Sequence, residues 1–223
     1  MGSLRLAVAR DEAFCFYYNE NFRELERAGF DMVFFSPLRA KGLPENIAGL
    51  YIGGGYPELH AGVLSGNNSL MVDINARIAD GMPVIAECGG FMYLTSGIRD
   101  ESGTEYPMCG VFDPVCIKKD RLVRFGYVEV FDSTGSWLDS GEGIRGHEFH
   151  YYDTSDRAAS ERAAGSGPCG VEARIVKASG GAEYGGIYIS GSIWAGWPHL
   201  YFRSRPAYAE SFFRKCSSYR RIM

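Results

Sequence analysis

A cysteine between an apolar run and two glycines is the residue in this sequence best placed to act as a nucleophile. Residues 83–87 predict a buried strand, Cys88 follows it, and Gly89 and Gly90 permit a sharp turn into a helix that begins at Phe91. A residue at such a turn is presented outward at the carboxyl end of a strand, where open α/β sheets bind ligands. We expect the helix N-terminus to favour the thiolate and small residues to let backbone N–H groups reach an oxyanion.

The remaining cysteines lack this setting. For them we expect the usual role of free cysteine, a small buried apolar residue. They are Cys15, Cys109, Cys116, Cys169 and Cys216. The sequence has no C-x-x-C pair and no recognisable secretory signal, which predicts reduced thiols and a cytoplasmic location.

A thiol nucleophile needs a base or a charge partner, and the chain has four histidines. His199 follows an apolar run at 192–197, close to Gly196 and Pro198, so it can lie at the same sheet edge as Cys88. The other three are His60, His147 and His150. Spacing alone does not choose among the four, and a packed histidine is the alternative for each. The last two suggest a metal, but no third ligand is evident, so no metal site is expected.

The elements that must position these residues alternate between strand and helix in the first hundred residues. Apolar runs predict strands at 4–9, 31–35, 47–52 and 83–87, with helices between them and after the cysteine. This alternation predicts an α/β fold with a doubly wound, mostly parallel sheet and helices on both faces. Asn19 or Asn21 is expected to cap the first helix, and Gly29 to end it.

The second half of the chain predicts further strands, some of them antiparallel, and a final helix. The strands are expected at 111–117, 122–131, 171–176, 184–189 and 192–197, the loops at 132–143 and 153–170, and the helix at 205–219. No internal repeat or domain boundary is evident.

Bulk properties exclude several classes of function. The chain has 223 residues, enough for one large domain, and its hydrophobic content of 46% is ordinary for a globular protein. A net charge of −4 and a pI near 5.6 argue against nucleic-acid or membrane-surface binding. No apolar run approaches the roughly 20 residues that span a bilayer.

Five motifs in a fixed order carry a resemblance to a known family. They are Ala7–Tyr18, Gly53-Gly54-Gly55-Tyr56-Pro57-Glu58-Leu59, Ala86–Leu94 around the cysteine, Arg121–Tyr127, and Gly146-His147-Glu148-Phe149-His150-Tyr151. Together they resemble the C-terminal glutaminase domain of the cobyrinate a,c-diamide synthase family, over nearly the whole chain.

The resemblance implies the class I glutamine amidotransferase fold, with a flavodoxin-like core, and assigns roles to residues. Cys88 matches the nucleophile and His199 the catalytic histidine. Backbone near Gly54, Gly55 and Gly89 matches the oxyanion hole. Arg124 is a candidate for gripping the glutamine α-carboxylate with two parallel hydrogen bonds, with a surface ion pair as the equal alternative.

One departure concerns the third member of the triad. Many class I amidotransferases have His-Pro-Glu, whose glutamate orients the histidine. Here Leu200 and Tyr201 follow His199, so that glutamate is absent. Glu87 lies next to Cys88 but is expected on the wrong side of the strand to replace it.

The resemblance also implies a reaction and partners. It is that of a glutamine-hydrolysing amide ligase, in which glutamine supplies ammonia for the a and c carboxylates of a corrinoid in cobalamin biosynthesis. ATP and Mg²⁺ are expected in an N-terminal synthetase domain absent from this chain, because no G-x-x-x-x-G-K-[ST] occurs. The partners implied are glutamine, that domain and the corrinoid bound mainly by it, with no nucleic acid or membrane and with a homodimer left open. Residues 1–3 are expected to be a cloning remnant, and 4–223 the glutaminase domain.

Three alternatives stay open at this point. The same chemistry can serve another acceptor, such as hydrogenobyrinate, nickel sirohydrochlorin or a cell-wall lipid precursor, although the Gly-Gly-Gly-Tyr-Pro-Glu and Gly-His-Glu-Phe-His motifs favour the tetrapyrrole group. A catalytically silent interaction domain is less expected, since Cys88 and His199 are both present. A cysteine peptidase on a similar fold is the third. Residues 14–18 and 147–151 are expected at the interface with the synthetase domain.

Overall fold

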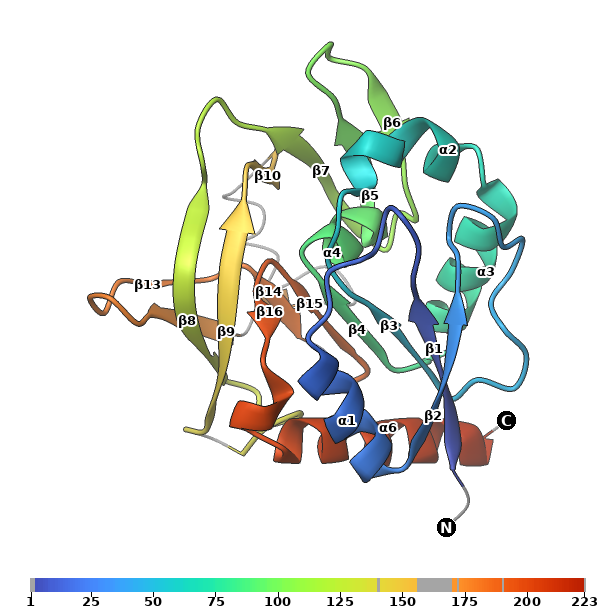
Figure 1. Ribbon diagram of the computed structural model, residues 1–223, viewed down its shortest axis with the longest axis vertical. Helices are drawn as coiled ribbons and strands as arrows, with labels where there is room; N and C mark the ends of the chain where they lie inside the picture. The colour runs from blue at the N-terminus through green and yellow to red at the C-terminus, as the bar shows by residue number, and fades with distance from the viewer. Residues whose placement is uncertain (1–2, 140, 156–169, 172, 190, 223) are drawn as a thin grey trace.

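A seven-stranded, mostly parallel sheet forms the centre of the molecule (Figure 1). The computed structural model describes residues 3–139, 141–155, 170–171, 173–189 and 191–222. The strand order is β11-β14-β15-β4-β3-β1-β2, and the five strands from β15 to β2 pair in parallel. Their bounds are β1 Leu4–Ala9, β2 Phe30–Phe35, β3 Gly49–Ile52, β4 Val84–Glu87, β11 Gly170–Val171, β14 Ile187–Ile189 and β15 Ile193–Gly196. The predicted doubly wound α/β architecture is confirmed.

Helices cover both faces of this sheet (Figure 1). On one face lie α1 (Asn19–Ala28) and α6 (Ala207–Ile222), whose apolar residues pack with alternate residues of β1, Leu6 and Val8. On the other lie η1 (Pro57–His60), α2 (Ala61–Ser65), α3 (Asn68–Ala79) and α4 (Gly89–Leu94), packed against Ala7 and Ala9. The period-2 alternation of a strand therefore divides the apolar residues of β1 between two cores.

The sequence predicts the end of the first helix correctly but not its start. Gly29 ends α1 in the left-handed conformation at φ +112°, as predicted. The predicted N-cap is wrong, because Tyr18 precedes α1 and no side chain caps it. Asn21 is instead fully buried and donates its Nδ2 hydrogen to the carbonyl oxygen of Leu200 at 2.8 Å.

The second half builds two smaller sheets. One has the order β13-β12-β8-β9-β16 and the other β10-β7-β5-β6. The bounds are β5 Thr95–Arg99, β6 Glu105–Pro107, β7 Phe112–Lys118, β8 Arg124–Asp132, β9 Gly143–His150, β10 Tyr152–Thr154, β12 Ala173–Lys177, β13 Glu183–Tyr184 and β16 His199–Leu200, with η2 at Phe202–Ser204. The expected antiparallel pairing is confirmed between β8 and β12 and between β14 and β15, and β8 also pairs with β9.

Two strand predictions in this half need correction. The eight-residue strand β9 was not predicted, because its buried face carries Gly146, Glu148 and His150 rather than apolar side chains. The single strand expected at 184–189 is two strands in different sheets, divided at Gly186, which has φ +129°. The predicted loop at 153–170 lies mostly outside the described residues. None of the helices in the described part of the chain is both long and apolar enough to cross a membrane.

Candidate active site

Cys88 occupies a strained turn at the carboxyl end of β4. Its φ of 48° and ψ of −104° lie in a region that non-glycine residues rarely adopt. The backbone on either side fixes this conformation, because the Cys88 N–H donates to the carbonyl of Gly196 at 2.7 Å and the Cys88 carbonyl accepts from Met92 at 2.9 Å. Strain held in this way at a strand-to-helix turn is typical of a nucleophile elbow.

His199 reaches the same corner of the sheet from the neighbouring strand. Gly196 at the end of β15 pairs with Glu87 at the end of β4, and His199 follows three residues later in β16. The imidazole is buried, with the ring of Phe16 at 4.5 Å and edge-on. Its Nδ1 has no hydrogen-bond partner among the described residues.

The other histidines lie in η1 and on β9, the strand that pairs with β16. His60 is in η1, and His147 is part of the outer face of β9. His150 stacks on Trp197 at 4.3 Å, and its Nδ1 contacts the carbonyl of Tyr152 at 2.7 Å. Of the four candidates, His199 is the one that follows β15, the strand paired with β4 before Cys88. No cluster of possible metal ligands occurs in the described ranges.

A glycine segment after β3 lies against His199 and against Gly89, the residue that follows Cys88. A Cβ atom at Gly54 would stand 2.2 Å from Cε1 of His199, so the imidazole occupies the space that a side chain would need. A Cβ atom at Gly89 would stand 3.1 Å from the backbone nitrogen of Gly55. The backbone of Gly55 and Gly89 is therefore adjacent beside Cys88, as an oxyanion hole requires.

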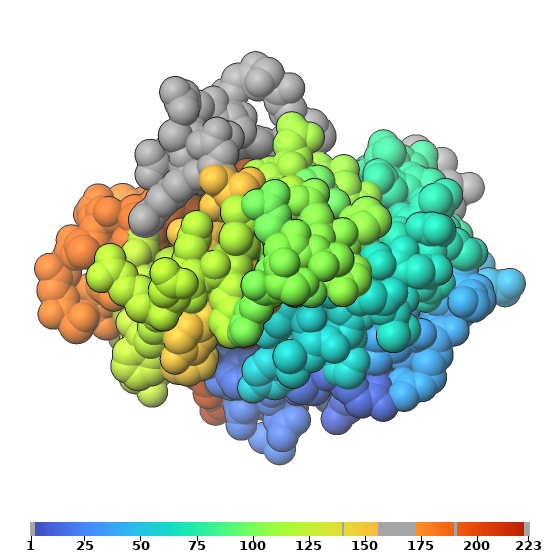
Figure 2. Space-filling model, turned by 90° about the horizontal axis from the view of Figure 1, so that it is seen from above, coloured from blue at the N-terminus to red at the C-terminus, as the bar shows by residue number. Residues whose placement is uncertain are grey.

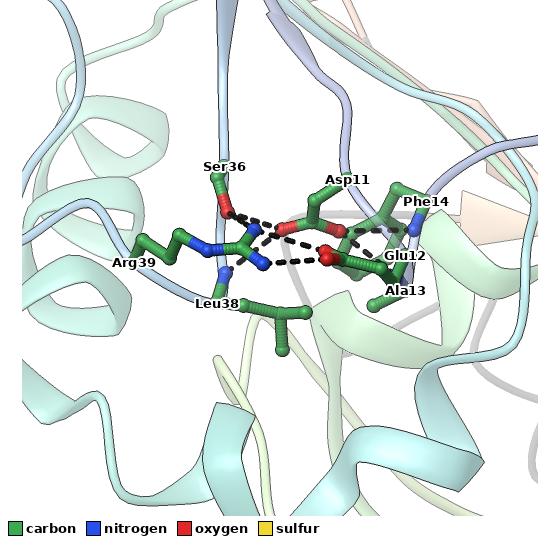
Figure 3. A network of polar contacts seen from close by, with 7 residues as sticks. All are labelled: Asp11, Glu12, Ala13, Phe14, Ser36, Leu38 and Arg39. Carbon is green, nitrogen blue, oxygen red and sulfur yellow. Dashed lines mark hydrogen bonds and ion pairs between the residues drawn. The ribbon is translucent and has the colours of Figure 1, made fainter.

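The partly buried carboxylate of Asp11 fixes the loop that contacts this glycine segment (Figure 3). Asp11 accepts hydrogen bonds from the backbone N–H groups of Ala13, Phe14 and Leu38 and from the hydroxyl of Ser36. The carbonyl of Ala13 in turn accepts from the N–H of Tyr56 at 2.9 Å. Asp11 thus joins the loops after β1 and β2 and fixes the chain that follows Gly55.

The resting charge state differs from the sequence expectation. Burial raises the pKa of Cys88 to about 12, the nearby Glu58 carboxylate adds to the increase, and a hydrogen bond from Gly89 N–H opposes it. The expected thiolate is therefore not the favoured state of the thiol in this structure, because desolvation outweighs the N-terminus of a six-residue helix. Burial likewise lowers the pKa of His199 to about 3, so the pair rests as a neutral thiol and a neutral imidazole.

Arg124 lies at the start of β8, facing the inner side of its sheet. Its guanidinium stacks over the ring of Tyr184 at 4.3 Å, and it forms no ion pair with any described residue. Burial raises the pKa of Glu148, and the positive charge of Arg124 partly opposes this increase. Arg124 therefore forms neither the surface ion pair nor a contact with Cys88 among the described residues.

Sequence reasoning did not identify two acidic residues near the thiol. Glu58 and Glu148 both act on the pKa of Cys88, and the pKa of each is itself raised by burial. Both stood inside motifs that carried the resemblance, Gly-Gly-Gly-Tyr-Pro-Glu and Gly-His-Glu-Phe-His. Their presence there was the available signal, but only the fold brings the two motifs together. The cysteines of the described residues, Cys15, Cys88, Cys109, Cys116 and Cys216, are free thiols, as expected. Cys109, Cys116 and Cys216 are buried as predicted, whereas the prediction is wrong for Cys15, which is exposed.

The fold is that of the class I glutamine amidotransferases. A structure titled glutamine amidotransferase aligns with a TM-score of 0.65 at 15% identity, covering 95% of this chain and 98% of that one. PurLQS from Thermotoga maritima aligns with a TM-score of 0.61 at 16% identity, covering 98% and 99%. At such identities the likeness shows the fold alone.

The chain belongs to the CobB/CobQ-like glutamine amidotransferase domain family, whose profile matches residues 5–207. It is 50% identical to the cobyrinate a,c-diamide synthase of Caldanaerobacter subterraneus over 149 residues, which are 66% of this chain and 33% of that protein. It is 38% identical to the enzyme of the same name from Thermoplasma volcanium over 225 residues, 98% of this chain and 46% of that protein. The chain thus spans less than half the length of these relatives.

Proposed function

We propose that this chain is a glutaminase in which Cys88 attacks the side-chain amide carbon of glutamine. The observation that carries the proposal is the strained, buried Cys88, whose neighbour Gly89 adjoins the backbone of Gly55, with a neutral His199 packed against the preceding residue, Gly54. This set supplies a nucleophile, a proton acceptor and oxyanion donors, which together are what acyl transfer from an amide requires.

The proposed chemistry starts from the neutral pair. As the sulfur–carbon bond forms, the thiol proton passes to His199, and the amide oxygen receives hydrogen bonds from backbone N–H groups near Gly55 and Gly89. The imidazolium then protonates the leaving nitrogen, the carbon–nitrogen bond breaks, and ammonia departs. Water gives a proton to His199 and attacks the thioester, which releases glutamate and restores the thiol.

The acceptor of the ammonia belongs to the proposal as well. The names of the relatives support a cobyrinate a,c-diamide synthase, in which an ATP- and Mg²⁺-dependent synthetase half forms the a and c amides of a corrinoid in the cytoplasm. Residues 4–223 are its glutaminase part, and the length of the relatives leaves room for the synthetase half. Amidation of hydrogenobyrinate or nickel sirohydrochlorin remains the alternative reaction, since the acceptor would be bound outside this chain.

An exposed aromatic surface supports contact with that synthetase half. On the outer face of β8 and β9, the rings of Phe125, Tyr127, His147, Phe149 and Tyr151 contact one another at centroid distances of 5.6 to 6.0 Å. Phe125 and Tyr127 are 60% and 75% exposed. Residues of β8 (yellow-green) and β9 (yellow) are visible at the surface in Figure 2. Exposed aromatic rings in contact are enriched in protein interfaces.

Covalent labelling with 6-diazo-5-oxo-L-norleucine, an electrophile that mimics glutamine, tests the glutaminase proposal. Mass spectrometry should find one adduct, on Cys88, which excess glutamine suppresses and which is absent from Cys88→Ser. The exposed Cys15 serves as the control thiol, because a reagent that ignores the glutamine site should modify it instead. Labelling of Cys15 without Cys88, or labelling of Cys88 that peptides suppress and glutamine does not, would contradict the proposal.

A further inference from the structure

The imidazole of His199 has no carboxylate bonded to it among the described residues, yet the chain holds His199 in place by another route. We propose that Glu87 is the positioning residue for His199, and that it acts through the peptide N–H of Leu200 rather than through the imidazole. The inference rests on the proposed glutaminase function for its catalytic meaning, but the geometry stands independently of it.

The first step is the position of β16 at the edge of its sheet. His199 and Leu200 pair with His147 and Gly146 of β9, and Tyr201 N–H donates to the carbonyl of Arg145 at 2.8 Å. In an antiparallel pair, alternate residues direct their backbone groups toward and away from the partner strand. The N–H and carbonyl of Leu200 therefore point away from β9, where no strand bonds them.

Buried side chains take the place of that missing strand. Oε1 of Glu87 accepts from Leu200 N–H at 3.1 Å, and Asn21 donates to the Leu200 carbonyl at 2.8 Å. Asn21 also accepts from Phe202 N–H at 2.9 Å. The peptide groups that follow His199 are thus fixed on both sides, and a buried N–H without its acceptor would cost about 1–3 kcal/mol.

Glu87 is itself held rigidly and faces away from the thiol. Its Oε2 accepts from the hydroxyl of Tyr51 at 2.9 Å, and it is 2% exposed. Along β4, Ala86 and Cys88 belong to the core under α3 and α4, whereas Ile85 belongs to the core under α1 and α6. Glu87 shares the side of Ile85, which is why it cannot bond the imidazole as the missing triad glutamate would.

The two anchors also connect the nucleophile to the base. Cys88 N–H donates to the carbonyl of Gly196, and Glu87 accepts from Leu200 N–H, so adjacent residues of one strand grip the chain on both sides of His199. A shift of the 196–200 segment relative to Cys88 would break both bonds. A misplacement of about 1 Å is enough to cost on the order of 10²-fold in rate.

Paired substitutions in the whole chain separate positioning from general stability. Glu87→Met removes the acceptor at similar length, Glu87→Gln keeps an acceptor oxygen, and Asp132→Asn changes another buried carboxylate, one that bonds Thr134 and Trp137 far from β16. We expect Glu87→Met to slow labelling of Cys88 by 6-diazo-5-oxo-L-norleucine by about tenfold to a hundredfold. Glu87→Gln should recover most of that loss, and Asp132→Asn should label like the parent protein.

The same measurement in a His199→Gln background gives the decisive comparison. If Glu87 acts through His199, adding Glu87→Met there should cause no further loss beyond about twofold, the usual error of additivity. A full second loss would mean that Glu87 supports the fold in general, and would overturn the inference. If Glu87→Met does not fold, Tyr51→Phe, which removes one bond to Glu87, should show a smaller loss with the same dependence on His199.

A titration that needs no glutamine chemistry keeps the inference testable if the glutaminase proposal fails. In protein labelled with ¹³C at histidine Cε1, the signal that His199→Gln removes should stay in its neutral form to the lowest pH at which the protein is folded, since the pKa is about 3. Because burial lowers the pKa of His199, an imidazole that is no longer held in place in Glu87→Met should titrate closer to the ordinary value of about 6.5. Glu87→Gln should leave the titration unchanged. An unchanged titration in Glu87→Met would overturn the inference, whereas absent labelling of the parent protein would overturn only the glutaminase proposal.

Discussion

At the scale of single residues, burial decides the chemistry of the site more than sequence neighbours do. The sequence pointed to Cys88 through its elbow, whereas spacing left four histidines open and the resemblance pointed to His199. In the structure, both residues follow paired strands of the central sheet, β4 and β15. The charge states of Cys88 and His199 could not be predicted from the sequence, because they depend on residues far apart in the chain. Phe16 covers His199, and Glu58 lies near Cys88. For Cys88, burial raises the thiol pKa more than the N-terminus of the following helix lowers it.

The raised pKa of Cys88 predicts how the thiol reacts with a reagent that has no affinity for the glutamine site. Iodoacetamide reacts with the thiolate. At any pH below the pKa of about 12, the thiolate fraction rises about tenfold for each unit by which the pH increases. In Cys15→Ser protein, we expect Cys88 alkylation to be slow at pH 7 and to rise steadily to pH 10, as measured by mass spectrometry. A plateau at neutral pH would instead indicate a preformed thiolate–imidazolium pair.

At the scale of elements, the strands that are apolar on both faces were predictable and the strands with polar buried faces were not. The strands β1 and β4 stood out as short apolar runs, whereas β9 hides Glu148 and His150 on its inner face. Asn21 illustrates the same difficulty, since an asparagine near a helix start favours a cap by local rules. Its actual partner, Leu200, is 179 residues away and could be found only from the fold.

The glycine segment after β3 gives a prediction at this scale. Gly54→Ala would place a Cβ atom 2.2 Å from His199, so the imidazole or the segment must move. We expect labelling of Cys88 by 6-diazo-5-oxo-L-norleucine to fall by about tenfold or more. Gly62→Ala in α2 is the matched control, because its Cβ atom would meet Tyr106 at an ordinary 3.6 Å. Equal labelling in the two variants would show that contact between Gly54 and His199 is unimportant.

At the scale of the whole molecule, one pocket extends from the rings beside His199 to the aromatic surface of β8 and β9. Phe16 covers His199 and contacts Tyr18, and Tyr18 contacts Tyr201. Tyr18 and Tyr201 line the same pocket as Tyr127 and His147. Of residues 14–18, which the sequence predicts at an interface with the synthetase half, Phe14 is buried in the core and Phe16 is 43% exposed.

This continuity predicts that the aromatic surface couples glutamine use to amide formation in a protein that carries this chain together with its synthetase half. Tyr127→Ser should lower amide formation driven by glutamine by about tenfold, because truncating one aromatic side chain in an interface often costs about 2 kcal/mol or less. Amide formation driven by ammonium should change little, since it does not need the glutaminase. The ratio of glutamate produced to amide formed should rise. Val72→Ser on α3 is the matched control, since Val72 is 69% exposed on an element outside the β8–β9 surface. If Tyr127→Ser and Val72→Ser gave the same ratio, the synthetase half would have to dock elsewhere, and Phe16, which lies directly over His199, would be the next position to change.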